Sequence, residues 1–411
     1  MHTFLPANIL IPNVNSMEKW SVIACDQYTS EESYWNRVKT NVKDSPSSLN
    51  VILPEIYLDE KDIRIPMIND TMEEYLEKKL FKEYKNSFVY VERTLLNGSI
   101  RKGIVGMVDL EQYDYTPDSV SNIRASEKTV LERIPPRKEI RKDAPIELPH
   151  ILLLCDDDKK ELIESVEKIK STLPVLYDFN LMEQGGHIKG WLLQGDAVAN
   201  FQRRLEEYDK EADRRYQDLD ALAILYATGD GNHSLATAKA CYEDLKKSLS
   251  EQEALEHPSR YALVELENIH DDSLKFEPIH RIIKKTDVEK LLKSFQTMCA
   301  HTTGNPIQWV TKDEMGTIYL DDSKGQMPVA ILQNFLDAYL STNKGEIDYI
   351  HGDDSLKELA NESDAIGFLL PSMNKSDLFR GIIADGVLPR KTFSMGHAQE
   401  KRYYLEARRI K

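Results

Sequence analysis

The chain has 411 residues, 41% of them hydrophobic, which is long enough to bury a substantial core in two or three structural units. Its 69 acidic and 53 basic residues give a formal net charge of −16, which argues against a nucleic-acid binder with a broad basic surface. Four dispersed cysteines, without a Cys-x-x-Cys pair or a long apolar segment, exclude a disulfide framework and predict a soluble, cytoplasmic protein with no membrane partner.

The first section of the chain, residues 1–145, is predicted to be rich in strands. An apolar run at 88–91 and the glycine-punctuated segment 97–108 favour strands joined by tight turns. Thr29 and Glu32 have the spacing of a capping box, which predicts a helix over the aromatic-rich segment that follows.

The two later sections, residues 146–285 and 286–411, alternate strands with helices. Strands are predicted at 151–155, 221–226, 261–266, 347–350 and 366–370, and helices at 159–173, 199–219, from His233 onward, and at 288–298, 329–341 and 355–362. Alternation of this kind favours an α/β to α+β fold, in which helices cover a mixed sheet. The core with the functional turn is predicted to lie in residues 146–285.

The most informative segment, residues 229–234, joins an apolar run to a helix of small residues. Gly229 and Gly231 permit backbone angles that other residues avoid, and apolar residues recur at helical spacing from Leu235 onward. The first amides of such a helix have no intrahelical partner and favour an anion. A hairpin turn at Asp-Gly is disfavoured by the helical spacing. A simple helix N-cap at Asn232 or Ser234 remains an alternative.

Five blocks of the sequence, in order, resemble the bacterial family known as domain of unknown function 1015. Arg-Ala-Ser-Glu-Lys-Thr at 124–129 resembles its Arg-His-Glu-Lys/Arg-Thr block, and an apolar strand follows at 149–156. Gly-Asp-Gly-Asn-His-Ser at 229–234 resembles its Asp-Gly-His-His-Arg turn. Glu-Pro-Ile-His-Arg at 277–281 and Leu-Pro-Arg-Lys-Thr-Phe at 388–393 resemble two further blocks.

The family's turn is similar in its own right to the helix-opening motif of the ParB and sulfiredoxin superfamily, which includes enzymes that phosphorylate free serine. This resemblance implies a ParB/sulfiredoxin-like core with additional N- and C-terminal segments, and a nucleotide bound at the turn. The sequence departs from the motif at Asn232, where His is usual, and at Ser234, where Arg is usual. Loss of the Arg removes a bidentate phosphate partner, so another cation must take its place.

Residues from distant blocks are predicted to converge on the turn. Asp230 is predicted to act as catalytic base or as Mg²⁺ ligand, His233 as an acid, base or hydrogen-bond donor, and Glu127 as a further catalytic carboxylate. The residues expected to hold the phosphate donor are Gly229, Gly231, Asn232, Ser234, His280, Arg281, Lys391 and Thr392. Asp26, Glu31 and Glu32 are additional carboxylates near the first long helix.

These residues favour a phosphotransferase, which moves phosphate from a nucleotide or another phosphoanhydride to a small hydroxyl metabolite such as free serine. Its cofactors would be Mg²⁺ and the phosphate donor, and its partner a small-molecule substrate. The alternative, favoured by the two departures from the motif, is a nucleotide- or metabolite-binding switch protein without catalysis. The sequence does not predict the oligomeric state.

Overall fold

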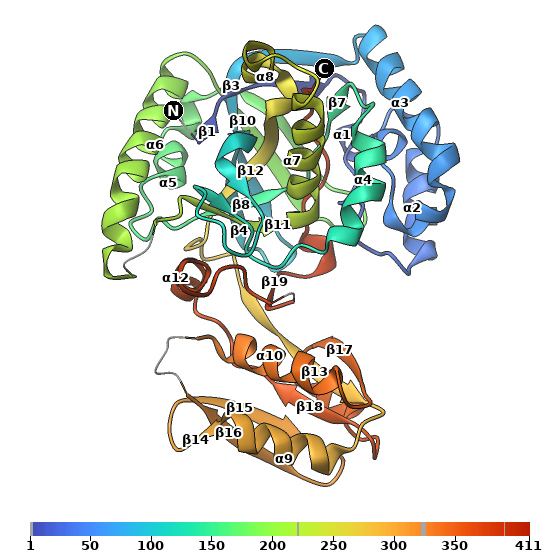
Figure 1. Cartoon of the computed structure of the whole chain (residues 1–411). Helices are drawn as coiled ribbons and strands as arrows, with labels where there is room; N and C mark the ends of the chain where they lie inside the picture. The colour runs from blue at the N-terminus through green and yellow to red at the C-terminus, as the bar shows by residue number, and fades with distance from the viewer. Residues whose placement is uncertain (1–2, 220–221, 322–325, 390) are drawn as a thin grey trace.

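The computed structural model describes residues 3–219, 222–321, 326–389 and 391–411. The chain forms a large body and a smaller one, and strand β13 (Phe276–Lys284) runs from one into the other (Figure 1). No helix in these ranges is long and apolar enough to cross a membrane.

The large body is built on a mixed sheet, to which the described residues contribute eleven strands. Strand β11 (Tyr226–Asp230) pairs in parallel with β6 (Ile123–Arg124) on one side and antiparallel with β8 (Leu152–Cys155) on the other. β1 (Phe4–Leu5) pairs with β4, and β2 (Ala7–Pro12) pairs with β3. The remaining strands follow the order β5 (Tyr113–Asp114), β6 (Ile123–Arg124), β11 (Tyr226–Asp230), β8 (Leu152–Cys155), β12 (Tyr261–Asn268), β4 (Ile100–Asp109), β3 (Phe81–Thr94), β10 (His187–Leu193), β9 (Val175–Asn180).

Alternating side chains of this sheet pack into different cores on its two faces. On β3, Val89 and Val91 belong to the core on one face, whereas Phe88 and Tyr90 belong to the core on the other. Successive side chains of a strand point to opposite faces, so a continuous apolar run predicts a strand covered on both sides. Helices on the two flanks of the sheet supply that cover (Figure 1).

The helices divide between the two faces. The first core is covered by α1 (Met17–Trp20), α2 (Glu32–Val42) and α3 (Lys61–Glu77), and α4 (Ile134–Arg141) packs against it. The second is closed by α5 (Ile163–Glu167), α6 (Asp196–Arg215) and α7 (Asn232–Lys246), with α8 (Glu251–Glu256) after them. The short ladder of β7 (Ile146–Glu147) with β20 (Arg408–Arg409) ties the end of the described chain to this body.

The smaller body has its own sheet, and β13 is shared with the large body. Its first part pairs with β19 (Phe393–Met395), and its second part pairs with β17 and β18. The strands are β14 (Ala300–His301), β15 (Asn305–Val310), β16 (Met315–Leu320), β17 (Glu346–His351) and β18 (Ile366–Leu369). The helices are α9 (Val288–Cys299), α10 (Pro328–Leu340), α11 (Asp353–Leu359) and, near the junction, α12 (Lys375–Asp385).

The predicted fold class, a mixed sheet covered by helices, is confirmed. The helix predicted at 159–173 is shorter, since only Ile163–Glu167 is α-helical. The strand predicted at 221–226 begins later, at Tyr226, and residue 221 lies outside the described ranges. The residues just before the strand bond to a side chain instead of a neighbouring strand, since Arg124 Nη2 donates to the carbonyl oxygens of Leu222 (2.9 Å) and Ala223 (3.1 Å).

One other prediction differs from the structure. Helix α2 begins at Glu32 with Glu31 at its N-cap and no side-chain cap, so Thr29 does not form the predicted capping box. The three-part division of the chain stays a prediction; β4, from the first part, pairs with β12, from the second, over seven residue pairs from Tyr261 to Glu267. The division near residue 285 lies at the end of the shared strand β13.

Candidate functional site

The glycine turn after β11 forms the start of α7 as the sequence predicts. Gly231 is the N-cap residue, with φ of 77° and ψ of 26°, and α7 has no side-chain cap. A Cβ at Gly231 would lie 3.0 Å from the Cα of Ile151, so a side chain there is disfavoured by the tight contact as well as by the backbone angle. Among the described residues, no side chain caps the start of α7, whose first amides lie at the positive end of the helix dipole. The amides of Ser234 and Leu235 bond back to the Gly231 carbonyl (2.9 and 3.0 Å).

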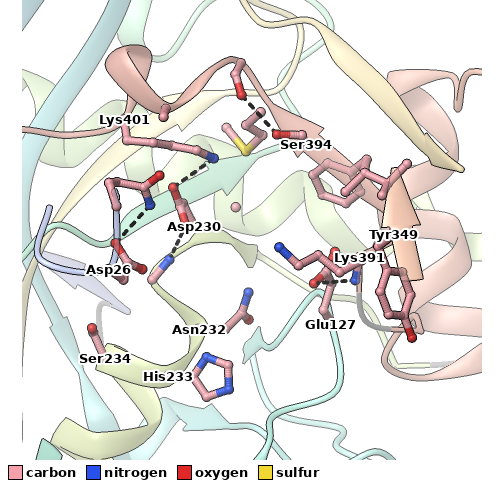
Figure 2. A pocket seen from close by; sticks show the side chains of 18 of the residues that line it. Asp26, Glu127, Asp230, Asn232, His233, Ser234, Tyr349, Lys391, Ser394 and Lys401 are labelled. Carbon is pink, nitrogen blue, oxygen red and sulfur yellow. Dashed lines mark hydrogen bonds and ion pairs between the residues drawn. The ribbon is translucent and has the colours of Figure 1, made fainter. Parts of the chain in front are cut away.

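This turn lies in a cavity of about 700 Å³ between the two bodies. Residues 229–234 line one wall, and the segment 391–401 lines another (Figure 2). β19 packs directly onto the turn, since a Cβ at Gly229 would lie 2.8 Å from the sulfur of Met395. The other lining residues are Asp26, Gln27, Thr29, Glu55, Glu127, Lys128, Val130, Arg137, Glu277, Ile279, Tyr349 and His351.

Asp230 contacts both the glycine turn and the segment 391–401. Its Oδ1 atom accepts a hydrogen bond from the Gly231 amide (2.9 Å), and its Oδ2 atom lies 3.2 Å from the Nζ atom of Lys401. The two side chains are only 21% and 14% exposed, so solvent screens the ion pair weakly. Nothing in the local sequence around Lys401 predicts this contact.

Lys401 is placed by two buried arginines. Arg93 donates to the carbonyl oxygens of Gln399 (2.6 Å) and Glu400 (3.0 Å), and Arg101 donates to the same Glu400 oxygen (2.9 Å). Charged donors make stronger hydrogen bonds than neutral ones. The backbone that carries Lys401 is therefore fixed against the large sheet.

Asp26 completes this side of the cavity. Its Oδ2 atom lies 3.6 Å from the Nε2 atom of His150, and the same Nε2 atom is 3.3 Å from the Oγ atom of Ser234. Burial acts to raise the pKa of Asp26, but His150, Gln27 and Lys401 outweigh it and hold the pKa well below its usual range. Asp26 is consequently a carboxylate at neutral pH.

Glu127 and Arg281 hold the backbone of Lys391. The carboxylate of Glu127 accepts from the amides of Lys391 and Thr392, each at 3.1 Å, and Arg281 donates to the Lys391 carbonyl (2.9 Å). Lys391 has a φ of 58°, which is uncommon for a residue with a side chain. Its side chain extends into the cavity between Glu127 and Asp230 (Figure 2). Burial raises the pKa of Glu127, although the two backbone bonds and Lys391 oppose this shift.

The cavity contains cationic side chains beside the carboxylates of Asp26, Glu55, Glu127, Asp230 and Glu277. Lys128, Lys391 and Lys401 all line it. Burial, followed by the charge of Lys391, lowers the pKa of His351, so this ring is neutral at pH 7. Among the described residues, no ion pair joins Lys391 to a carboxylate. A negatively charged ligand would supply one.

Three predicted residues at the start of α7 line the cavity but also have local partners. Asn232 Oδ1 accepts from the hydroxyl of Thr228, and His233 Nε2 accepts from the amide of Val130 (3.2 Å). The proton of His233 therefore resides on Nδ1, and Nε2 is not available as a base. Ser234 contacts His150 rather than standing alone.

His280, Arg281 and Thr392, predicted to contact the phosphate donor, do not line the cavity. Arg281 is fully buried, with Nε on the Gln333 side-chain oxygen (2.9 Å) and its guanidinium over the ring of Tyr349. It is a positioning residue for the Lys391 loop. Thr392 is also buried, and its hydroxyl donates to the Pro389 carbonyl (2.5 Å).

His280 lies in the smaller body. Its Nδ1 atom accepts from the Leu370 amide (3.1 Å), so Nε2 carries the proton and donates to Asp353 (2.9 Å). Alternation explains this placement, because on β13 the neighbouring side chain of Ile279 lines the cavity and that of His280 points to the opposite face.

The buried His280 predicts a loss of stability in acid. Burial lowers its pKa below 6.5, so the unfolded chain binds the proton more readily than the folded one. The stabilisation is present above pH 6.5 and is lost as the pH falls through 6.5 toward the folded-state pKa. Urea unfolding of wild type and His280→Gln at pH 7.5, 6.5 and 5.5 should show a shallower pH dependence in the variant, by at most about 1.4 kcal/mol per pH unit. Parallel curves would contradict the assignment.

The described residues contain no cluster of three or more His, Cys, Asp or Glu side chains that could hold a metal ion. Asp230 and Asp26 are nevertheless oxygen donors in one cavity. Mg²⁺ is commonly held by one or two carboxylates together with substrate phosphates, so these donors fit an ion that arrives with a nucleotide.

Comparison with known proteins gives distant structural likenesses. No curated protein sequence matches the chain. A conserved hypothetical protein from Pyrococcus furiosus aligns over 72% of this chain and 92% of its own, with 11% identity and a TM-score of 0.37. C-terminally truncated SbnI from Staphylococcus aureus aligns over 71% and 83%, with 9% identity and a TM-score of 0.36. A free serine kinase in complex with AMP aligns over 73% and 90%, with 12% identity and a TM-score of 0.38.

The family comparison covers nearly the whole sequence. The model of the family described as "Protein of unknown function (DUF1015)" matches residues 9–408. The match includes both bodies and every segment that lines the cavity. The five sequence blocks that suggested this family all lie within it. The chain belongs to the DUF1015 family.

Proposed function

We propose that the protein is a phosphotransferase, which moves the terminal phosphoryl group of a nucleotide or another phosphoanhydride to the hydroxyl group of a small metabolite such as free serine. The observation that carries this proposal is the meeting of the uncapped start of α7 with Lys391 and Lys401 in one cavity. The helix start supplies amide donors, and the two lysines supply mobile positive charge. Together they match the requirements of a polyphosphate chain.

The cations have separate tasks in this reaction. Lys391, without an ion-pair partner among the described residues, would neutralise charge that develops on the transferred group. Lys401 is already paired with Asp230, so it would hold that carboxylate in place and contact a neighbouring phosphate oxygen. The Arg that the turn lacks at Ser234 would thus be replaced by lysines from a distant segment.

The carboxylates would handle the acceptor hydroxyl. Asp230 would accept its proton as the hydroxyl oxygen forms a bond to the terminal phosphorus. The bond from that phosphorus to the bridging oxygen would break, and the rest of the donor would leave with the electron pair. Asp26, held ionised by His150, would orient the hydroxyl. Mg²⁺ brought by the nucleotide would neutralise phosphate charge between these carboxylates.

Exchanging Asp230 for Asn tests the proposal directly. The amide keeps the shape but accepts no proton, so phosphoryl transfer should fall about 100-fold or more, in line with the usual contribution of a general base. Purified protein would be incubated with Mg²⁺, ATP and a panel of amino acids and polyols that includes free serine, and phosphorylated products would be measured by mass spectrometry. The exposed Asp213 on α6, changed to Asn, is the matched control.

The outcomes separate two functions. Transfer by wild type that is unchanged in Asp230→Asn removes Asp230 from the mechanism. Nucleotide binding without product with every acceptor favours the alternative, a nucleotide- or metabolite-binding switch protein. The local hydrogen bond of Asn232 to Thr228 is the observation that favours this second function, because it turns one polar side chain of the turn away from the ligand.

A further inference from the structure

A second cavity, of about 140 Å³, lies beside the main one and differs from it in chemistry. We call it the annex. Its lining is dominated by buried apolar side chains, which include Ile52, Leu53, Met72, Ala144 and Leu148. Buried apolar side chains normally pack without voids, so a cavity that interrupts them calls for an occupant.

The annex and the main cavity share part of their lining. Ser234 and Arg137 line both. His150 lines the annex, and its Nε2 atom contacts Ser234 (3.3 Å) and faces Asp26 (3.6 Å), both of which line the main cavity. Ser234 and His150 thus stand between the two spaces, and a ligand that passes them would have its charged part in the main cavity and its apolar part in the annex.

The spacing along α7 sets the distance between these parts. Ser234 and Thr237 both line the annex and lie three residues apart, on one face of the helix. The annex is thus reached about one helical turn, or about 5 Å, beyond the amides at the start of α7. A sugar ring separates a phosphate from an aromatic base by a similar length.

The size of the annex suits a single ring system. An apolar cavity of roughly 150 Å³ lined by aliphatic side chains is large enough to bind benzene. Ligand pockets also combine an apolar lining with a few convergent polar groups, which the shared wall of Ser234 and Arg137 supplies here. A phosphate, sugar and flat base in one molecule would fill the whole space.

We propose that the annex receives the aromatic base of a nucleotide whose phosphates lie at the 229–234 turn. This inference rests on the proposed function, since it assumes an anionic ligand at that turn. It makes the phosphate donor a nucleotide rather than an inorganic phosphoanhydride. The annex would thereby set the donor specificity of the protein.

Two ligands and two filled variants test the inference. ATP should bind wild type at least tenfold more tightly than inorganic tripolyphosphate, in isothermal titration calorimetry with Mg²⁺. Ala144→Leu and Val51→Phe, on different parts of the annex wall, should weaken ATP binding at least tenfold and leave tripolyphosphate binding within twofold. Ala338→Leu, at an exposed position of α10, is the matched control.

A third measurement needs no variant. Millimolar adenosine should compete with ATP and should not displace tripolyphosphate. Equal affinity of wild type for ATP and tripolyphosphate, or failure of adenosine to compete, overturns the inference whether or not the variants fold. A variant that changes only the KM for the acceptor also overturns it, by assigning the annex to the acceptor. Absence of binding by both ATP and tripolyphosphate instead defeats the proposed function itself.

Discussion

Replacing Lys391 by alanine should reduce phosphoryl transfer by about 100- to 1000-fold, equivalent to about 3–4 kcal/mol of transition-state stabilisation. The ammonium group lines the cavity, and the described residues offer it no ion-pair partner. The charge it would neutralise is therefore that of the ligand. Steady-state kinetics with ATP and the best acceptor, together with calorimetric titration of ATP, would measure the effect.

The unusual backbone of Lys391 provides a sharper control. Because φ is 58°, Lys391→Gly relieves backbone strain that Lys391→Ala retains. Both variants should lose the same activity, because both lack the charge, whereas the Gly variant should be more stable by about 1 kcal/mol. Lys312→Ala, at an exposed position of the smaller body, should behave like wild type. Full activity in both Lys391 variants would exclude this residue from the site.

The largest effect on stability is expected at Arg402. Its guanidinium is buried and bonds to the carboxylates of Glu265 (2.6 Å) and Glu406 (2.7 Å) and to the Pro149 carbonyl (3.0 Å). Removing one member of a buried ion-pair network leaves charges without compensation. Arg402→Met should therefore lower the free energy of unfolding by about 3–5 kcal/mol in urea titrations at pH 7.

Two further proteins test the cause of that loss. Combining Arg402→Met with Glu265→Gln and Glu406→Gln removes the unpaired charges, so part of the lost stability should return. Arg409→Met, at the exposed neighbouring position on β20, should change stability by less than about 0.5 kcal/mol. If the triple variant were less stable than Arg402→Met alone, unpaired charge would not be the cause.

The local parts of the site are predictable from sequence because they depend on neighbours in the chain. Two glycines at 229 and 231 with helical spacing afterwards are sufficient to place the start of α7, and the structure has it at Asn232. Lys391 is predicted from the resemblance of a sequence block rather than from residue spacing, and it lines the same cavity. Thr29 shows the limit of local patterns. The capping-box spacing predicts Thr29 as the N-cap residue of α2, but in the structure Glu31 occupies that position.

The remaining parts depend on contacts between distant segments. Lys401 contacts Asp230 because the segment after β19 runs past the glycine turn. His150 contacts Asp26 because the chain before β8 passes the N-terminal loop. No periodicity records such pairings. Arg281 illustrates the converse error. It shares a face of β13 with the cavity-lining Ile279, but its guanidinium is bonded to the Lys391 carbonyl and its Nε atom to Gln333, so it does not line the cavity.

The segment 399–409 leaves the ribosome after all of the large sheet, yet Arg402 neutralises Glu265 on strand β12 of that sheet, and Arg408 neutralises Glu147 on β7. During synthesis, these carboxylates are therefore either hydrated or protonated until the arginines that pair with them have been made. Lys401 arrives with the same stretch. The contact between Lys401 and Asp230 therefore forms only after this stretch has been synthesised.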